Sequence, residues 1–462
     1  MYKRYQIETF PAKLESTRLG KFTIIRNSDC VNCGQCAEWC IYEVHTRDAH
    51  DPRLMAEPSS RLCKNCFACI QNCPRQAIEM KKNEEYERLG DSYWTPHKIW
   101  TIWNEAEEGM IPVFGAGYRG PFTGTGFDEI WTDMSEIVRP TRDGIHGREY
   151  IATAVDIGRK LPWLPEFKNP VLPNCSELQV PILFETNPLE LRLRPILLSI
   201  VKAAKKLGTL AMLSIEDYSD ELEPHLPSLA FRFPLEKITD LVRIPWREVR
   251  LLEIDLPRTF SMRELEPALE ELKSNNPKAI ISLRVQDSFV PQELFSQFLE
   301  KRADVLHISF DAHGRSPDRK AFISESVRKA HLEFVEHRIR GEITIIGKGG
   351  IAAAEHVPKL IICGADAVVV DLALLVAMGC RVCQACDLDS CPAGIRELDQ
   401  DTATQRIINL TSSWRDQLLE ILSAMGIKDV RRLRGEVGRA MFYEEIERKS
   451  FEFIFEQRGN SK

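Results

Sequence analysis

Two short cysteine runs near the N-terminus share one spacing, and that spacing limits what this segment can fold around. The runs contain Cys30, Cys33, Cys36 and Cys40, then Cys63, Cys66, Cys69 and Cys73, with Pro74 after the second run. Both runs read C-x2-C-x2-C-x3-C, in which three closely spaced thiolates can bind three corners of an iron–sulfur cube. The alternative, a pair of zinc sites, favours two C-x2-C pairs instead of triplets. The spacing therefore favours two 4Fe–4S clusters.

The fourth cysteine of each run is expected to begin a helix and to reach the other cluster. This crossed ligation assigns Cys30, Cys33, Cys36 and Cys73 to one cluster, and Cys63, Cys66, Cys69 and Cys40 to the second. The pattern resembles bacterial two-cluster ferredoxins, although Ile41 stands where the first run would have a proline. The resemblance implies a ferredoxin-like domain over residues 1–82 that carries electrons and does no catalysis itself.

A third group of cysteines lies far along the chain, in the stretch MGCRVCQACDLDSCPAGI. It contains Cys380, Cys383, Cys386 and Cys391. Neighbouring cysteines this close bind metal more often than they pair as disulfides, so the group predicts a further iron–sulfur cluster. Cys175 and Cys363 stand alone and are expected to be small buried hydrophobic residues.

From about residue 170 the chain alternates short β-branched runs with amphipathic stretches. The expected strands are PILFE from Pro181, TLAML from Thr209, LAFRF from Leu229 or DLVRI from Asp240, LLEIDL from Leu251, AIISLRV from Ala279, VLHISF from Val305, EITIIG from Glu342 and AVVVD from Ala367. Eight β/α units of this size predict an α/β fold, the TIM (β/α)8 barrel, over residues 171–400. Residues 83–170 are interpreted as a linker and Gly-rich wrapping segment, and residues 401–462 as C-terminal helices.

The charge balance and the apolar runs exclude other classes. The net charge of -7 argues against a nucleic-acid surface. The N-terminal residues contain no apolar signal-peptide region, and the longest apolar run, Leu372–Met378, is much shorter than a membrane helix requires. We therefore expect a cytoplasmic protein without a transmembrane segment.

Several stretches together resemble the glutamate synthase family, in particular the synthase subunit that carries its own ferredoxin module. They are SEIVRPTRDGIHGREYI, the pair GKGGI and GADAVVV, and the spacing C-x5-C-x4-C followed by PAGI. The resemblance implies an FMN-binding TIM barrel and a 3Fe–4S cluster held at the positions of Cys380, Cys386 and Cys391. It further implies that electrons pass from a reductase through the clusters to FMN, which reduces 2-iminoglutarate.

The barrel departs from the family at its active site. Glu185 stands in FETNPLE where the family has small residues, LSIED replaces a Gly-rich turn, and PRTFSMREL replaces a segment that grips 2-oxoglutarate. Arg284 replaces a lysine, and FDAHGRSP replaces a Gly-rich loop. Asp371 and Leu372 replace a Gly-Thr pair that would meet the flavin phosphate. The cluster ligands are retained, the keto-acid site is lost and the flavin site is altered.

We therefore expect an iron–sulfur flavoprotein oxidoreductase subunit that relays electrons within a larger redox complex, with no catalytic residue assigned. The residues expected to bind FMN are Lys348, Gly349, Gly350 and Ile351 near the phosphate, Arg284 at the pyrimidine edge, and Asp371. The alternatives are an ammonia-dependent glutamate synthase and a flavin-free scaffold that carries clusters. Because no dinucleotide-binding G-x-G-x-x-G unit is recognised, the expected partners are an NAD(P)H-dependent flavoprotein or a ferredoxin, in a hetero-oligomer.

Cys383 is the feature that the family pattern lacks. It lies inside the five-residue gap, so the run reads C-x2-C-x2-C-x4-C. A fourth thiolate near the open corner of a 3Fe–4S cluster would retain the labile iron. The sequence therefore predicts a third 4Fe–4S cluster, the alternative being that Cys383 is a small buried hydrophobic residue.

Overall fold

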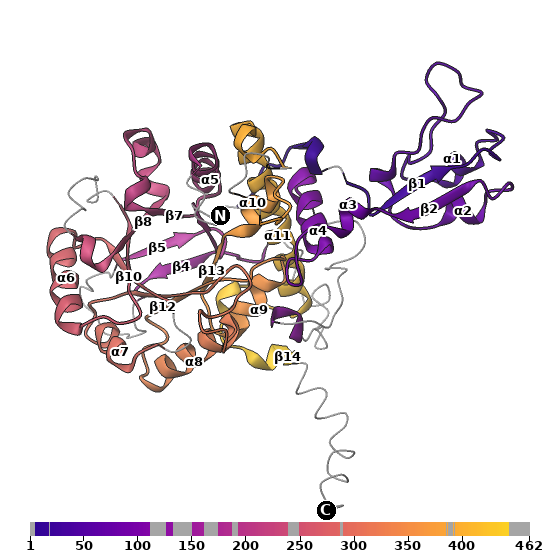
Figure 1. The fold of residues 1–462 in the computed structure, drawn as a ribbon. Helices are drawn as coiled ribbons and strands as arrows, with labels where there is room; N and C mark the ends of the chain where they lie inside the picture. Colours follow the sequence, from indigo (N-terminus) through magenta and orange to yellow (C-terminus); the bar gives the residue numbers. More distant parts are fainter. Residues whose placement is uncertain are drawn as a thin grey trace, which may run out of the picture. The chain divides into compact units, whose positions relative to one another are not determined.

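The computed structural model divides the chain into two compact units, which are treated separately below (Figure 1). The barrel unit comprises Met1–Ala12, Thr101–Met378 and Ile395–Lys462, and the cluster unit comprises Lys13–Trp100 and Gly379–Gly394. The structure describes residues 5–17, 19–110, 126–132, 150–160, 174–186, 193–238, 249–286, 290–384, 386, 391 and 393–442. Most of the Gly-rich segment and most of the stretch SEIVRPTRDGIHGREYI lie outside these residues.

Eight parallel strands close into a barrel in the order of the sequence, with β13 pairing back onto β6. The strands are β6 (Ile182–Glu185), β7 (Ala211–Ser214), β8 (Leu229–Pro234), β9 (Leu251–Asp255), β10 (Ile280–Val285), β11 (Val305–Ser309), β12 (Thr344–Lys348) and β13 (Ala367–Val370). The predicted TIM-barrel class is confirmed. LAFRF forms the third strand, and the alternative DLVRI lies outside the described residues.

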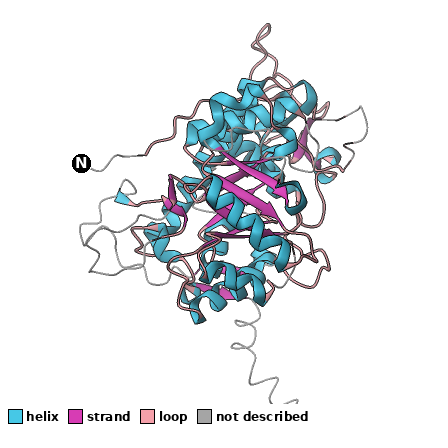
Figure 2. Ribbon diagram, turned by 90° about the vertical axis from the view of Figure 1, so that its left-hand side faces the viewer, coloured by secondary structure: helices cyan, strands magenta, loops and turns pink. Residues whose placement is uncertain are grey.

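The strands are buried on both faces, which explains their continuous apolar runs. Every residue of β11 and of β13 is buried, including His307 in the middle of β11. Helices surround the barrel, and Figure 2 shows them on both sides of the strands. They are α5 (Arg194–Leu207), α6 (Met262–Asn275), α7 (Gln292–Leu299), α8 (Ile323–Glu336), α9 (His356–Cys363), α10 (Leu372–Ala377) and α11 (Gln400–Ala424). Short 3-10 helices connect β7 to β8.

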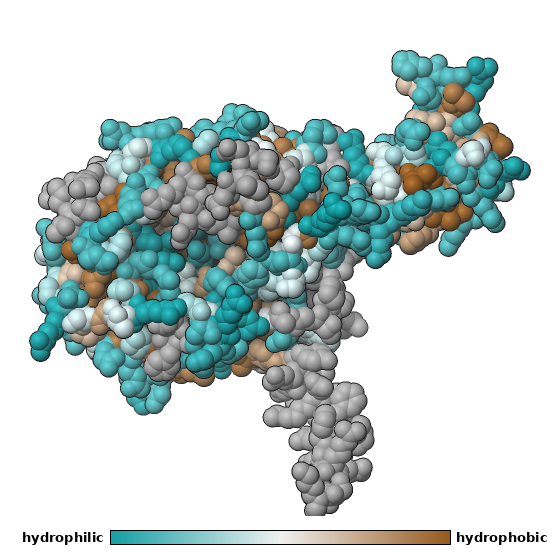
Figure 3. Space-filling view, in the orientation of Figure 1, coloured by the Kyte–Doolittle hydropathy of each residue, from teal (hydrophilic) through white to brown (hydrophobic). Residues whose placement is uncertain are grey.

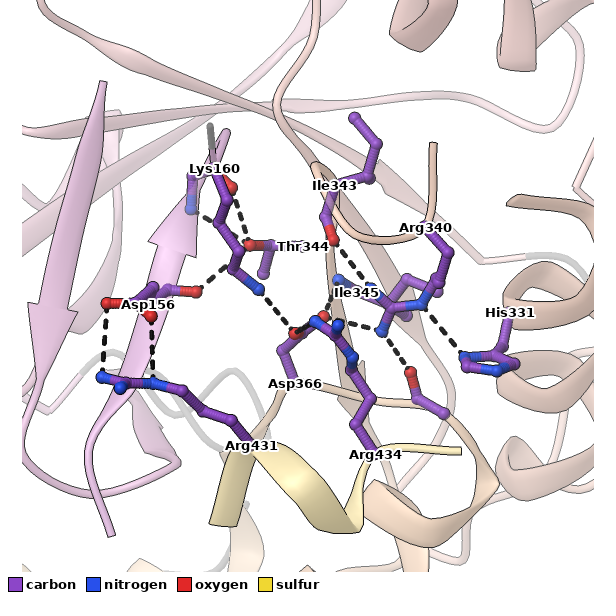
Figure 4. Close-up of polar contacts among 12 residues, drawn as sticks. Asp156, Lys160, His331, Arg340, Ile343, Thr344, Ile345, Asp366, Arg431 and Arg434 are labelled. Atoms are coloured by element: carbon purple, nitrogen blue, oxygen red, sulfur yellow. Dashed lines mark hydrogen bonds and ion pairs between the residues drawn. The ribbon is translucent and has the colours of Figure 1, made fainter. Parts of the chain in front are cut away.

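The amino-terminal end of the barrel is held by charged side chains. The small sheet of β4 (Val155–Gly158) and β5 (Cys175–Leu178) meets β12 there, where the Thr344 hydroxyl donates to the Gly158 carbonyl at 2.8 Å. Beside it the buried carboxylate of Asp366 accepts from Lys160, Arg340 and Arg434 (Figure 4). A further two-stranded sheet joins β3 (Ile130–Thr132) to β14 (Ala440–Phe442). In TIM barrels this end serves stability, and the opposite rim carries the site.

The cluster unit is built on one antiparallel hairpin. The strands β1 (Phe22–Arg26) and β2 (Ile78–Lys82) pair with Ile24 opposite Met80. The helices α1 (Gln35–Trp39), α2 (Ala68–Gln71) and α3 (Glu84–Glu87) complete it, and the unit boundary falls within α4 (Pro96–Glu108). Brown, apolar surface is visible on this unit (Figure 3), where Val31, Trp39 and Ile41 are exposed.

The third cysteine run belongs to the cluster unit in the structure, whereas the sequence interpretation placed it within the barrel domain. The Gly90 amide donates to the carbonyl of Arg381 at 3.0 Å, and the Arg381 guanidinium donates to the carbonyl of Ser16 at 3.3 Å. These bonds between segments far apart in sequence attach Gly379–Gly394 to Lys13–Trp100. All three cysteine runs therefore lie in one compact unit.

Candidate functional site

The first cysteine site is a hollow lined by both N-terminal runs. Its cysteines are Cys30, Cys33, Cys36 and Cys73. Cys73 reaches this hollow because α2 ends at Gln71 and the chain turns back toward β2, where the Ala77 amide donates to the Cys73 sulfur at 3.3 Å. Arg26 and Arg75 also line the hollow and place positive charge beside it. The four thiols brought together are those of the crossed assignment.

The second site is likewise a hollow lined by three cysteines of one run and the fourth cysteine of the other run. Its cysteines are Cys40, Cys63, Cys66 and Cys69, joined by His45 and Lys64. Cys40 follows the last residue of α1, and Cys73 follows α2, so the expectation that the fourth cysteines begin helices is wrong. The helices are formed by the residues around the third cysteines instead, and the fourth cysteines lie where these short helices end. Burial raises the pKa of Cys69 to about 11, so a metal bound at this thiol would have to displace its proton.

The third run repeats the backbone conformation of the first two. In each run the residue before the second cysteine and the residue after it are left-handed: φ is 55° at Asn32 and 84° at Gly34, 60° at Asn65 and 61° at Phe67, and 54° at Val382 and 56° at Gln384. The same hydrogen bond also recurs, since Asn32 and Val382 each donate a backbone N–H at 3.4 Å to the first cysteine sulfur of their run. A β-branched residue such as Val382 is strained in this region, and such strain concentrates at functional sites.

The second cysteine of each run is exposed in all three runs. The middle cysteines, Cys33, Cys66 and Cys383, are exposed, whereas Cys380 is buried and Cys386 and Cys391 are half-buried. Burial raises the pKa of Cys380 to about 12. Cys383 is therefore not the buried hydrophobic residue of the alternative interpretation. Of the two isolated cysteines, Cys363 is buried as predicted, but Cys175 is exposed at the start of β5, so its predicted burial is wrong.

The predicted flavin-binding residues gather at the carboxyl-terminal rim of the barrel. Lys348 ends β12 and is followed directly by Gly349, Gly350 and Ile351. Arg284 lies near the end of β10, and Asp371 directly follows β13. The turn requires glycine at position 349, where φ is 128° and a Cβ would lie 2.8 Å from the Asp311 carbonyl oxygen.

Ion pairs cross the interior of the barrel at this rim. Arg232 of β8 donates to Glu185 of β6 at 2.9 Å and to Glu253 of β9 at 2.7 Å. Lys348 lies 3.2 Å from Glu185. Since β6 is adjacent to neither β8 nor β12 in the barrel, these side chains must point inward.

The remaining members extend this network to β10 and β11. Arg284 donates to Asp255 at 2.7 Å and to Ser309 at 2.9 Å. His307 and Ser282 both bond to Glu253, at 2.7 Å and 3.0 Å. Six of the eight strands, β6 and β8 to β12, thus contribute polar side chains to this network inside otherwise apolar runs.

The electrostatics keep the carboxylates of this network charged. Burial alone would raise the pKa of Glu185, but Arg232, Lys348 and Arg284 outweigh it and lower the pKa to about 2. Burial would likewise raise the pKa of Glu253, but the hydrogen bond with His307 and the charge of Arg232 outweigh it and lower the pKa. Burial lowers the pKa of His307, so its ring is neutral near pH 7.

Some donors in the network remain without an acceptor. Within the described part of the chain, Arg232 Nη2 and Arg284 Nε are buried and have no hydrogen-bond partner. Buried donors without a partner are rare, and they mark positions where a ligand or an unseen group completes the site. Arg232, Glu253 and His307 were not among the predicted site residues. The signal that could have found them is a single charged or imidazole side chain within each apolar strand.

Asp371 changes the part of the rim where a flavin phosphate would be expected. Its carboxylate is buried and accepts the backbone N–H of Leu372 at 2.6 Å, at the start of α10. It also lies 4.0 Å from the Lys348 ammonium. Burial raises the pKa of Asp371, which limits the negative charge that it presents. The side chain thus caps α10 at its first residue.

No helix in the described part of the chain combines the length and hydrophobicity of a membrane-spanning segment. The sequence matches the family model "Conserved region in glutamate synthase" over residues 258–428. It is 24% identical to the archaeal-type glutamate synthase [NADPH] of Thermotoga maritima, over 91% of this chain and 94% of that protein. It is 25% identical to the archaeal glutamate synthase [NADPH] of Archaeoglobus fulgidus, over 90% and 93% of the two chains.

Among solved structures, a flavocytochrome b2 mutant with pyruvate bound superposes with a TM-score of 0.45 at 14% identity, over 68% of this chain and 76% of that chain. At that similarity it adds nothing to the topology already described. The sequence relatives, in contrast, align along nearly the whole length of both chains, and the matched region includes the last strands of the barrel and the third cysteine run. The comparisons therefore support a relationship to the glutamate synthase family, at 24–25% identity to the relatives named above.

Proposed function

We propose that this protein is an iron–sulfur flavoprotein subunit that relays electrons between its clusters and FMN within a larger redox complex. The chain is similar to glutamate synthases along nearly its whole length and is an oxidoreductase, the enzyme class that the sequence predicts. The main support for a role in electron transfer is that three cysteine runs with the same backbone conformation lie in a single compact unit.

The cysteines would hold three clusters. Two 4Fe–4S clusters would use the crossed sets around the two hollows, and the third would use Cys380, Cys383, Cys386 and Cys391. The matching φ values of the third run support four-cysteine ligation, because they give Cys383 the same local setting as Cys33 and Cys66. When bound, such clusters accept and release single electrons, and the chain's part is to hold them and to set their potentials.

The barrel rim fits the ring end of FMN. The free Nη2 of Arg232 and Nε of Arg284 would donate to the carbonyl oxygens and ring nitrogens of the flavin, which requires donors at its pyrimidine edge. At the other end the phosphate would lie on the turn of Gly349 and Gly350, beside Lys348. The start of α10 is occupied by Asp371, so the phosphate would be held by that turn and Lys348 without a contact to α10. When bound, FMN would exchange electrons with the clusters.

The ion pairs of the rim argue against efficient glutamate synthesis. A dicarboxylate such as 2-oxoglutarate needs cations for both of its ends. Here Arg232 and Lys348 share Glu185, and Arg284 is paired with Asp255. A dicarboxylate would have to displace carboxylates of the protein, which costs several kcal/mol for buried pairs.

The second candidate, an ammonia-dependent glutamate synthase, is favoured by the full-length similarity to proteins of that name. Purified full-length protein with reconstituted clusters, given 2-oxoglutarate, ammonia and a strong artificial reductant, separates the two. We expect no glutamate above the background without enzyme, and robust turnover would establish the second candidate instead.

The flavin has its own test. Acid extraction of the native protein is expected to release FMN, identified by its fluorescence and chromatography. Protein that carries iron and sulfide but no flavin would instead be a scaffold that positions clusters.

Partners are expected to supply and remove the electrons. An NAD(P)H-dependent flavoprotein or a ferredoxin would serve, in a hetero-oligomer, and the exposed Val31, Trp39 and Ile41 beside the first clusters are suited to a transient contact. Purification of the native complex, followed by identification of its subunits, tests this.

A further inference from the structure

Arg26, the last residue of β1, lines the first cysteine hollow and is anchored there. Its Nη1 donates to two backbone carbonyls, of Met55 at 3.1 Å and of Ala56 at 3.0 Å. These bonds fix the plane of the guanidinium. Its Nε is buried and has no hydrogen-bond partner in the described part of the chain. The guanidinium of Arg26, which is always charged, therefore borders the hollow and carries an N–H group at Nε that has no acceptor.

The other end of the same guanidinium contacts the second site. Arg26 Nη2 lies 3.5 Å from Nδ1 of His45, and His45 lines the hollow of Cys40, Cys63, Cys66 and Cys69. His45 is 2% exposed. Arg26 and His45 thus form a continuous polar link from one cysteine hollow to the other, inside a unit whose core is otherwise apolar.

The tautomer of His45 follows from this contact. A guanidinium can only donate, so Nδ1 accepts and the single proton of the neutral ring is on Nε2. Burial and the charge of Arg26 lower the pKa of His45 to about 4, so the ring is neutral at physiological pH. Nε2 is buried and has no partner among the described residues. It is therefore a second N–H donor without an acceptor, on a side chain that borders the second hollow.

We infer that Arg26 and His45 donate these two N–H groups to the sulfur atoms of the two iron–sulfur clusters, and that the charge of Arg26 sets the reduction potentials of both. The inference rests on the proposed function, because it needs both clusters. Sulfur atoms of a cluster are the acceptors that buried donors beside thiolate ligands can find. Each cluster gains one negative charge when one electron enters, so a nearby cation and an N–H donor favour the reduced form and raise the potential.

The test is a set of substitutions in the full-length protein with its clusters reconstituted. Arg26→Gln removes the charge, and Arg26→Lys keeps the charge but removes the Nε donor. His45→Phe removes the second donor, while His45→Gln retains one near the same position. Arg75→Gln is the matched control, because Arg75 is an exposed cation that lines the same hollow as Arg26. Iron and sulfide contents are measured first, then midpoint potentials by redox titration followed by EPR.

Arg26→Gln is expected to lower both potentials, on the order of tenfold in each reduction equilibrium, which is about 59 mV for one electron. Arg26→Lys should recover part of that shift. His45→Phe should lower only the potential of the second cluster, and His45→Gln should restore it. Arg75→Gln should change the potentials much less, since solvent screens an exposed charge.

The outcomes separate this inference from the proposed function. Wild-type protein that binds no iron after reconstitution would overturn both. Normal iron and sulfide contents with potentials unchanged in Arg26→Gln, or changed no more than in Arg75→Gln, would overturn the inference and leave the proposed function standing. A purely structural role of Arg26 would reduce cluster content without moving the potential of the clusters that remain.

Discussion

The buried ion pairs of Asp366 are expected to make a large contribution to the stability of the barrel. This residue directly precedes β13 at the amino-terminal end of the barrel, and its side chain is 5% exposed. Figure 4 shows Lys160, Arg340 and Arg434 pointing toward its carboxylate. The distances are 2.8 Å to Arg340, 2.8 Å to Lys160 and 2.6 Å to Arg434. The carboxylate also accepts the backbone N–H of Ile345 at 2.8 Å. One carboxylate thus compensates three cations that would otherwise repel one another.

Asp366→Asn removes the charge with little change of shape. Removing one partner of a buried pair costs about 3–5 kcal/mol, because the remaining charge is left uncompensated. With three cations affected, we expect about 4 kcal/mol. For large domains, each kcal/mol of lost stability lowers Tm by roughly 2 °C or more. A loss of about 4 kcal/mol should therefore lower Tm by about 8 °C. Differential scanning calorimetry at one fixed scan rate measures it.

The control is Asp156→Asn. Asp156 pairs with Arg431 at 3.0 Å, but the Arg431 side chain is 38% exposed. Exposed pairs contribute about 0–1 kcal/mol, so Tm should change by at most about 2 °C. If Asp366→Asn lowers Tm no more than Asp156→Asn does, the argument from uncompensated buried charge is refuted.

The pH dependence of the same variant has a definite sign. Burial would raise the pKa of Asp366, but Arg340, Lys160 and Arg434 outweigh it and hold the pKa far below its usual range. A carboxylate with a lowered native pKa stabilises the fold above its unfolded pKa of about 3.9, and loses that contribution as the pH falls below it. The stability difference between wild type and Asp366→Asn should therefore be constant from about pH 5 to 8 and shrink below about pH 4. A difference that grows as the pH falls would contradict the assignment.

Three further predictions concern the clusters and the rim. Cys73→Ala should destroy first the EPR signal of the cluster held by Cys30, Cys33 and Cys36, and loss of the other cluster first would reverse the crossed assignment. Cys383→Ser should convert the third cluster to 3Fe–4S, with the loss of one iron per chain and a new signal near g ~2.01 in the oxidised protein, which an idle thiol would not produce. Glu185→Gln should release Lys348 and Arg232 from their shared carboxylate and increase the affinity for 2-oxoglutarate in calorimetry, and unchanged affinity would show that these cations do not face the rim's ligand.

The sequence by itself determined the parts of this protein that depend on local spacing. The interval between cysteines fixes which thiols can surround one cube, so the twelve clustered cysteines are identifiable without coordinates. The eight barrel strands are likewise predictable, because strands buried on both faces must be continuous apolar runs. The turn at Gly349 is also predictable, because it depends only on the neighbouring residues, a strand followed by two glycines.

Only the tertiary structure decided which distant side chains meet. The placement of Cys380 and its neighbours in the cluster unit depends on bonds to Gly90 and Ser16, far away along the chain. The neutralisation of Arg232 by Glu185 and Glu253 requires closure of the barrel, which turns three strands toward one interior. The link from Arg26 to His45 likewise exists only once the hairpin and the loop fold together. Interactions of this kind depend on direction and on burial, and neither is encoded in residue spacing.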